Sequence, residues 1–121
     1  MSERVEVAVV GAGQAGFAAS DWLAEREIGH VLFERDRPGA SWRDRWDSFC
    51  LVTPNWTLDL PGFPYDGDDP DGFISREAIA GYVVRYREFL EAPVRESTEV
   101  SNLRPSDDGW ILTTDTGEVR A

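Results

Sequence analysis

The stretch Val-Ala-Val-Val-Gly-Ala-Gly-Gln-Ala-Gly, residues 7–16, decides the fold of this chain. Its four apolar residues predict a buried strand, and the glycines that follow predict a tight turn into a helix. Gly11 suits the turn itself, Gly13 leaves the backbone open to a pyrophosphate, and Gly16 lets the helix pack closely on the strand. The N-terminus of such a helix favours negative charge. The stretch therefore predicts a dinucleotide-binding turn.

The residues on either side of this turn continue the pattern of a nucleotide-binding unit. We expect the first strand to begin near Val5, Gly29 to end the helix, and residues 30–33 to form a second, parallel strand. The apolar face of the helix is expected to hold Phe17, Ala18, Trp22 and residues 23–28. Glu34 lies 23 residues after Gly11, close to the spacing at which a carboxylate receives a pair of ribose hydroxyls. The alternative is a glycine turn in an unrelated α/β protein.

Composition sets the limits on function. A chain of 121 residues predicts one domain with one modest core. No apolar run approaches a membrane span, and the first strand follows the first residues directly, so we expect neither a membrane segment nor a targeting signal. The formal net charge of −11 argues against nucleic-acid binding. The single cysteine, Cys50, fits the reducing cytoplasm, and its apolar neighbours favour a buried, inert thiol.

Part of the negative charge gathers in one loop. The carboxylates of this loop are Asp66, Asp68, Asp69 and Asp71. A calcium loop of the EF-hand type would need a set order of oxygen ligands, a central glycine and a closing glutamate, and that order is absent. We therefore predict a solvated acidic loop and no metal site.

After the second strand the sequence predicts a long excursion, then a helix, then several short strands. Arg35–Gly72 is a long excursion rich in proline, glycine, aspartate and aromatic residues, whose tryptophans need burial or a ligand to stack on. A helix capped by Ser75 and closed by Pro93 should then bury one face. The residues of that face are Ile79, Tyr82, Val83, Tyr86, Phe89 and Leu90. Short strands are expected at 94–95, 98–103, 110–114 and from 119, with turns at 107–109 and 115–118. The predicted fold is α/β and Rossmann-like: a parallel sheet, a long excursion after the second strand and an antiparallel meander, and it is incomplete.

Several blocks of this sequence resemble one known family. They are residues 9–16, 33–35, 39–42, 51–54, 63–64 and 75–77. They are similar to the flavin-dependent monooxygenases with two dinucleotide domains, which include the flavin-containing, Baeyer–Villiger and plant auxin-forming enzymes. The resemblance implies that residues 1–121 are the N-terminal portion of an FAD-binding domain. The rest of that domain and the NADPH domain would then be absent.

The resemblance also implies roles for individual residues. The pyrophosphate of FAD would be held by Gly11, Gly13, Gln14, Ala15 and Gly16. Glu34 would accept the hydroxyls of the adenosine ribose, and Arg35 either lies beside the adenine or is a solvated surface residue. Ser41 and Trp42 match a pair that passes near the flavin, with plain core packing as the alternative for Trp42.

Three further positions bear on the flavin site. Thr53 falls where the family runs its chain past the flavin ring, and the backbone of Val100 would read the adenine edge, although an ordinary strand valine has the same sequence signature. Many flavin-containing monooxygenases carry an asparagine directly after the residue matching Thr53. Here that position is Pro54, and Asn55 follows one residue later. No catalytic residue is therefore assigned.

The activity that the resemblance implies belongs to a longer parent enzyme. In that family NADPH reduces FAD, dioxygen adds to the flavin, and a peroxyflavin oxygenates a small nucleophilic or carbonyl substrate. The NADPH site would lie outside this chain, and the chain alone should be inactive and prone to self-association through exposed apolar surface. Two alternatives stay open: a flavin- or NAD(P)-dependent reductase or dehydrogenase without oxygenase activity, and a non-catalytic nucleotide-binding fragment.

Overall fold

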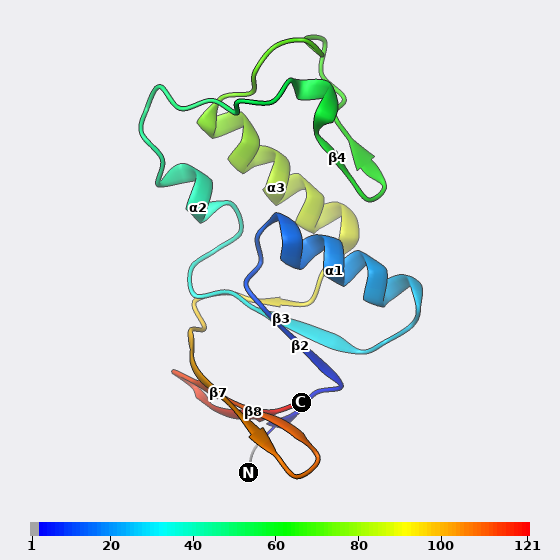
Figure 1. Ribbon diagram of the computed structural model, residues 1–121, viewed down its shortest axis with the longest axis vertical. Helices are drawn as coiled ribbons and strands as arrows, with labels where there is room; N and C mark the ends of the chain where they lie inside the picture. Colours follow the sequence, from blue (N-terminus) through cyan, green and yellow to red (C-terminus); the bar gives the residue numbers. More distant parts are fainter. Residues whose placement is uncertain (1–2) are drawn as a thin grey trace.

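The computed structural model describes residues 3–121 and contains two main sheets (Figure 1). The parallel sheet has the order β2-β3-β6, with β2 at Val7–Val10, β3 at His30–Phe33 and β6 at Val94–Arg95. The other sheet has the order β1-β9-β8-β7, with β1 at Glu3–Arg4, β7 at Val100–Ser106, β8 at Gly109–Thr114 and β9 at Gly117–Arg120. The predicted combination of a parallel sheet and an antiparallel meander is confirmed.

The predicted strand–helix–strand unit is present as β2, α1 (Gln14–Glu25) and β3. β2 and β3 pair in parallel with Val7 opposite His30, and the Gly11 N–H extends the pairing by donating to the Phe33 carbonyl at 2.8 Å. Parallel pairing brings the carboxyl ends of both strands to one edge of the sheet. The glycine turn and the residue after β3 therefore lie close together.

The first strand of the parallel sheet, β2, begins at Val7 rather than near Val5. The residues before it form the separate strand β1, which pairs in parallel with β9 while β2 pairs with β3. Between β1 and β2, the Val5 N–H donates to the carbonyl of Arg120 at 2.8 Å. This pairing spans nearly the whole chain, so local sequence could not reveal it.

The end of α1 also differs from the prediction. The helix ends at Glu25 rather than at Gly29, because Glu27 takes the left-handed conformation with φ 56°. The N–H groups of Glu27 and Ile28 then donate to the carbonyls of the last helical turn. The expected burial of Trp22 is wrong as well, since its ring is 52% exposed and is covered on one side by the Arg26 guanidinium at 3.6 Å.

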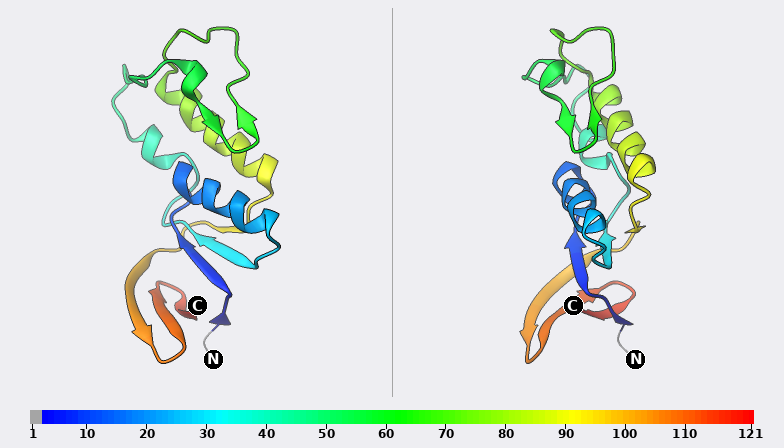
Figure 2. Two further views of the ribbon diagram at one scale, coloured as in Figure 1. Left: turned by 45° about the vertical axis from the view of Figure 1, so that its right-hand side comes forward. Right: turned by 90° about the vertical axis from the view of Figure 1, so that its right-hand side faces the viewer.

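The excursion after β3 folds as a separate tier above the parallel sheet (Figure 2). Its elements are α2 (Ala40–Arg43), the 3-10 turn η1 (Asn55–Thr57) and the hairpin of β4 (Asp59–Leu60) and β5 (Phe63–Pro64). It lies against α3 (Arg76–Leu90), whose N-terminus is capped as predicted: the Ser75 hydroxyl accepts a hydrogen bond from the Ala78 N–H at 3.2 Å.

The core joins α3 to both the excursion and α1. Tyr82 and Tyr86 are fully buried, and their hydroxyls donate to the carbonyls of Phe63 and Pro61. Burial raises the pKa of Tyr82 and raises the pKa of Tyr86 to about 12. The buried members of this core are Ala12, Phe17, Leu32, Leu58, Leu60, Ile79, Tyr82, Val83 and Tyr86. Phe89, which was predicted to share this face, is instead 56% exposed.

The C-terminal strands follow the predicted order with shifted limits. β7 begins at Val100 rather than Thr98, because the Thr98 N–H donates a hydrogen bond to the carbonyl of Glu34 at 2.9 Å instead of pairing with β8. It also continues through Ser106, three residues beyond the prediction. In the last hairpin the turn narrows to residues 115–116, and Gly117 already belongs to β9.

The prediction of a buried Cys50 is wrong. Residues 49–52 do not form a core strand: Cys50 makes one isolated antiparallel bridge to Ser75, and its side chain is exposed. Val52 nearby is 90% exposed. The exposed side chains thus alternate with Phe49 and Leu51, which are partly buried, and Leu51 packs against the core.

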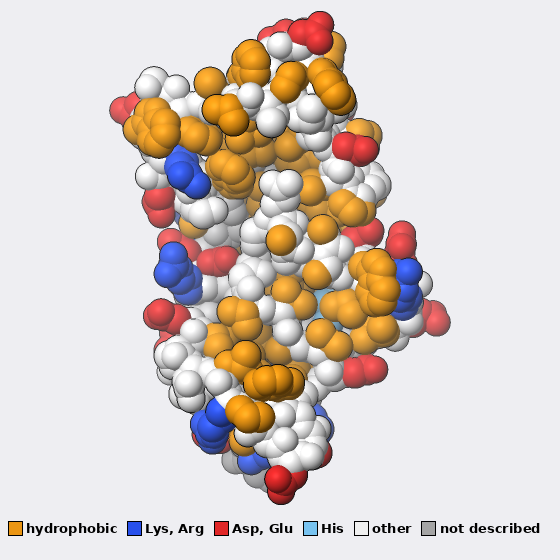
Figure 3. Space-filling view, viewed as in Figure 1, with side chains coloured by type: hydrophobic (Ala, Val, Ile, Leu, Met, Phe, Trp, Pro, Cys, Tyr) orange, Lys and Arg blue, Asp and Glu red, His pale blue; other side chains and the backbone are white. Residues whose placement is uncertain are grey.

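Large apolar side chains are exposed on the excursion and beside the parallel sheet (Figure 3). Trp46 and Trp56 of the excursion are each 63% exposed, and Val10 and Trp110 are exposed by half or more. Self-association through such surface stays a prediction. In the described part of the chain no helix has both the length and the apolar character needed to cross a membrane.

Candidate nucleotide-binding site

The glycine turn has the geometry that its sequence predicts. Gly11 has φ 99°, a backbone conformation that is strained for any residue with a side chain, so the turn needs glycine at this position. A Cβ on Gly16 would lie 2.2 Å from the carbonyl oxygen of Gly11, so only a glycine lets α1 start this close to β2. A Cβ on Gly13 would meet nothing within 4 Å. The backbone at Gly13 therefore faces open space.

That open space lies at the start of α1. Gly13 is the N-terminal cap residue, and no side chain caps the helix. The N–H groups of the first helical turn have no partner within the helix, so they are free to donate to a ligand. Together with the helix dipole they favour an anionic group such as a pyrophosphate.

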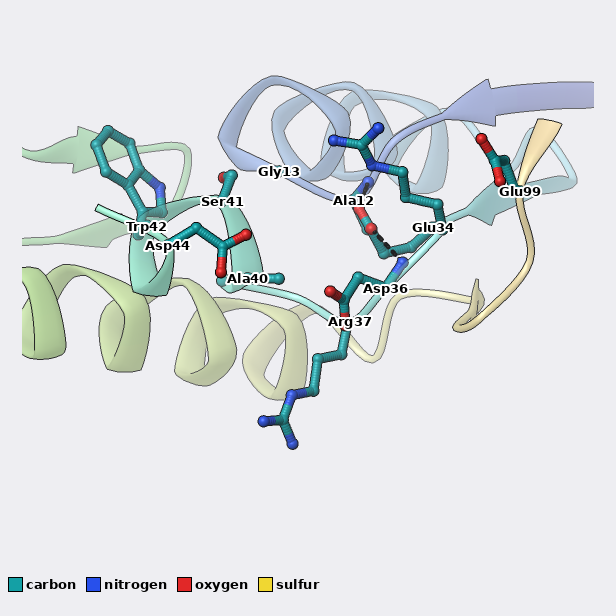
Figure 4. A pocket seen from close by; sticks show the side chains of 12 residues that line it. Ala12, Gly13, Glu34, Asp36, Arg37, Ala40, Ser41, Trp42, Asp44 and Glu99 are labelled. Carbon is teal, nitrogen blue, oxygen red and sulfur yellow. Dashed lines mark hydrogen bonds between the residues drawn. The ribbon is translucent and has the colours of Figure 1, made fainter. Parts of the chain in front are cut away.

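Glu34 is fixed beside this turn by two backbone groups. Its Oε1 accepts a hydrogen bond from the Ala12 N–H at 3.0 Å, and its Oε2 accepts one from the Asp36 N–H at 2.8 Å (Figure 4). The carboxylate is half-buried. It therefore has a set position at the carboxyl edge of the parallel sheet, with lone pairs left for donors such as hydroxyls.

The two features share one cleft of about 490 Å³. It is lined by Ala12, Gly13, Glu34, Arg35, Asp36, Arg37, Gly39, Ala40, Ser41, Trp42, Asp44 and Glu99. A neighbouring cavity of about 270 Å³ shares Glu34, Arg35 and Glu99 with the cleft and is also lined by Gly11 and Val100. The structure thus brings together Gly11, Gly13, Glu34, Arg35, Ser41, Trp42 and Val100, all expected from sequence.

Four expected residues line neither cavity. Gly16 lies against the carbonyl of Gly11, where it allows α1 to pack on β2. Gln14 and Ala15 are exposed in the first turn of α1, where their backbone groups rather than their side chains are placed to act. Thr53 is exposed in a bend of the excursion and is not among the residues that line either cavity.

Within the segment between Glu34 and Ser41, the sequence prediction missed Asp36 and Arg37. Asp36 and Arg37 line the cleft, and Gly39, with φ 84°, turns the chain into α2. A Cβ on Gly39 would lie 2.9 Å from the carbonyl oxygen of Ala80, so this glycine lets α2 lie against α3. Asp36 and Arg37 lie between the blocks 33–35 and 39–42, both of which were expected at the site, and this position in the sequence could have predicted their role.

The cleft has an acidic part, formed by carboxylates, and a part at the start of α1 that favours anions. Carboxylates of Glu34, Asp36, Asp44 and Glu99 outnumber the two guanidinium groups of Arg35 and Arg37. The acidic part suits hydroxyl donors, while the helix start suits a phosphate group. These residues fit a ribose joined to a pyrophosphate. No three His, Cys, Asp or Glu side chains among residues 3–121 are grouped to hold a metal ion.

The chain is similar to known oxidoreductases. No family model matches the chain. The chain is 37% identical over its whole length to an uncharacterized CzcO-like oxidoreductase of Geobacillus kaustophilus, of which it covers 35%. It is 29% identical over 92% of its length to an indole-3-pyruvate monooxygenase of Oryza sativa subsp. japonica, covering 28% of that protein. The chain therefore spans about a third of the length of these relatives.

Solved structures share the fold. A flavin monooxygenase from Stenotrophomonas maltophilia matches 98% of the chain with a TM-score of 0.87 at 23% identity, and the chain covers 36% of it. A bacillithiol disulfide reductase from Staphylococcus aureus matches 97% of the chain with the same TM-score of 0.87 at 15% identity, again with 36% of it covered. The same fold thus occurs in a monooxygenase and in a reductase.

Proposed function

We propose, from the similarity of this chain to a CzcO-like oxidoreductase, an indole-3-pyruvate monooxygenase and the fold of a flavin monooxygenase, that its cleft binds FAD. Residues 1–121 would then be the N-terminal portion of the FAD-binding domain of an NAD(P)H-dependent monooxygenase. One observation carries the proposal: the open backbone of Gly13 and the fixed carboxylate of Glu34 face the same cleft.

The residues of the cleft have distinct proposed roles. The N–H groups at the start of α1 bind the pyrophosphate, and Glu34 accepts the hydroxyls of the adenosine ribose. The adenine takes the neighbouring cavity beside Gly11 and Val100, with Arg35 at its border. Ser41 and Trp42 line the part of the cleft that leads toward the flavin ring. The carboxylate of Glu34 would repel the 2′-phosphate of NADP, so this cleft should prefer FAD.

FAD bound in this cleft would supply the redox chemistry between NAD(P)H and dioxygen. The NADPH site is proposed to lie outside this chain. The substrate is proposed to be a small nucleophilic or carbonyl compound. What these residues contribute is binding, orientation and exclusion of water from one side of the cofactor.

The test of FAD binding uses the whole protein with Gly13→Val. A valine side chain would fill the space beside the first helical turn, whereas the fold should tolerate it because nothing lies within 4 Å of that Cβ. The expected result is loss of the visible flavin absorbance with an unchanged circular dichroism spectrum. Gly81→Val is the matched control, since its Cβ also meets nothing within 4 Å and it lies on α3. Equal flavin content in both variants would refute the proposal.

A reductase without oxygenase activity is the second candidate, and the shared fold with a disulfide reductase favours it. Oxygen uptake by the whole protein separates the two. A monooxygenase should consume one dioxygen for each NADPH and each oxygenated product. NADPH oxidation that yields only peroxide, or none without a disulfide acceptor, would favour the reductase. A protein that binds nucleotide but oxidises no NAD(P)H would be the non-catalytic module.

A further inference from the structure

Some arginines of this chain contact a carboxylate or an aromatic ring, and others do not. The chain has 12 cationic side chains, all of them arginine, against 23 carboxylates. In the described residues 3–121, eight of these arginines form a salt bridge or lie over an aromatic ring. The other four are Arg35, Arg37, Arg43 and Arg120.

Two of these four arginines line the same cavity, together with a third arginine. The cavity measures about 260 Å³ and is lined by Arg37, Pro38, Arg43, Val84, Arg87 and Glu96. It lies between the segment that leads into α2, the middle of α3 and the chain after β6. Three guanidinium groups and one carboxylate give its lining an excess of two positive charges.

Two of the guanidinium groups have fixed positions. Arg43 donates to the carbonyl of Pro38 at 3.1 Å, and Arg87 pairs with Glu96 at 2.9 Å. The Arg37 side chain points away from Ala12 and Glu34 (Figure 4), and this residue lines both the nucleotide cleft and the arginine cavity. Like charges that line one cavity repel one another, and a bound anion would offset that repulsion.

We propose that this cavity binds an oxyanion of the phosphate class, either inorganic phosphate or the phosphoryl group of a small phosphomonoester. A phosphoryl group carries close to two negative charges and presents three acceptor oxygens, which three guanidinium groups can bind together. A carboxylate has a single charge and two oxygens, so it matches the cavity less well.

This cavity is separate from the nucleotide cleft. Arg37 lines both, but Arg43, Arg87 and Glu96 line the arginine cavity and not the cleft. Changes at Arg87 or Glu96 therefore report on the arginine cavity whether or not the cleft holds FAD.

The test is titration calorimetry of the whole protein with inorganic phosphate, glycerol phosphate and acetate at constant ionic strength. Arg87→Gln should weaken phosphate binding about tenfold, the loss of one charge-assisted interaction. Glu96→Gln should strengthen it about threefold, because it frees Arg87 and removes a repelling charge. Both variants lose the same ion pair, so an effect on folding would act in the same direction in both. Opposite shifts in phosphate affinity support the proposal.

Arg120→Gln is the control for general charge, because this arginine also lacks a partner but lies on β9 away from the cavity. It should leave phosphate affinity unchanged. The proposal is overturned by equal losses in Arg87→Gln and Arg120→Gln, by acetate binding as tightly as phosphate, or by no binding at about 10 mM phosphate. Tighter binding of glycerol phosphate than of phosphate would identify a phosphomonoester as the ligand, and the reverse would identify free phosphate.

Discussion

The strand–helix–strand unit at residues 7–34 and the excursion at residues 35–72 are held in different ways. In the first, backbone pairing between β2 and β3 and the packing of α1 fix the chain. In the second, regular pairing is limited to the short β4–β5 hairpin, and side chains from α3 hold the backbone. Tyr82 and Tyr86 donate to two carbonyls of this region, and the Arg76 guanidinium donates to the carbonyl of Arg45 at 2.9 Å.

The contrast shows which contacts position the residues on each side of the cleft. The glycine turn and Glu34 are placed by local geometry and two parallel strands. Ser41 and Trp42 are placed by α2, whose approach to α3 depends on Gly39. A clash between α1 and β2 at Gly16 should therefore destabilise the whole strand–helix–strand unit, while a lost contact from α3 should loosen the excursion first.

The largest effect should come from Gly16→Val. The new Cβ would overlap the carbonyl of Gly11 at 2.2 Å, so α1 would have to move away from β2. We expect a loss of about 3 kcal/mol or more in the free energy of unfolding, at the upper end for overpacking. Urea unfolding of the whole protein measures it. A change below about 1 kcal/mol, or one matched by Gly13→Val, would contradict this account of the turn.

Glu34→Ala should mainly affect cofactor binding. It removes an acceptor of ribose hydroxyls and leaves the N–H groups of Ala12 and Asp36 without partners. FAD binding should weaken by about 1–3 kcal/mol, the range for charge-assisted hydrogen bonds. Fluorescence titration with FAD measures the change. Glu34→Gln keeps one acceptor oxygen and should lose less, and equal binding of FAD and NADP to this domain would contradict the role of the carboxylate.

Tyr86→Phe should produce a smaller loss confined to the excursion. It removes the hydrogen bond to the Pro61 carbonyl while keeping the buried ring. We expect about 1 kcal/mol from a single hydrogen bond. Hydrogen exchange should show faster exchange around the β4–β5 hairpin and unchanged exchange in β2 and β3. Equal acceleration in both regions would show that the two halves unfold as one unit.

The raised pKa of Tyr86 predicts that the free energy of unfolding depends on pH. Its pKa is raised from 10.0 to about 12 in the folded chain, so folding favours the protonated hydroxyl. This contribution is fully present below pH 10 and is lost as the pH rises toward 12. Tyr82, whose pKa is also raised, adds in the same direction. Urea midpoints should fall between pH 10 and 12, and Tyr86→Phe should make that fall shallower.

The smallest effect is expected from Cys50→Ser. The thiol is exposed and its backbone bridge to Ser75 does not use the side chain. The free energy of unfolding should change by less than about 0.5 kcal/mol, as at most surface positions. A loss above 1 kcal/mol by urea unfolding would show that the excursion buries this residue in the whole protein.

The sequence by itself determined the strand–turn–helix–strand unit, the cap at Ser75 and the position of Glu34 at the edge of the sheet. Each depends on residues that are near one another in sequence and that leave few conformations open. The glycine spacing could therefore be read without the rest of the chain.

Tertiary structure alone decided the remaining features. The separate strand β1 and the later start of β2 at Val7 depend on pairing with β9, more than a hundred residues away. The exposure of Cys50 and the entry of Asp36 and Arg37 into the cleft depend on how the excursion lies against α3. Apolar composition predicts burial only when a partner surface is available, and long-range packing rather than local sequence supplies that surface.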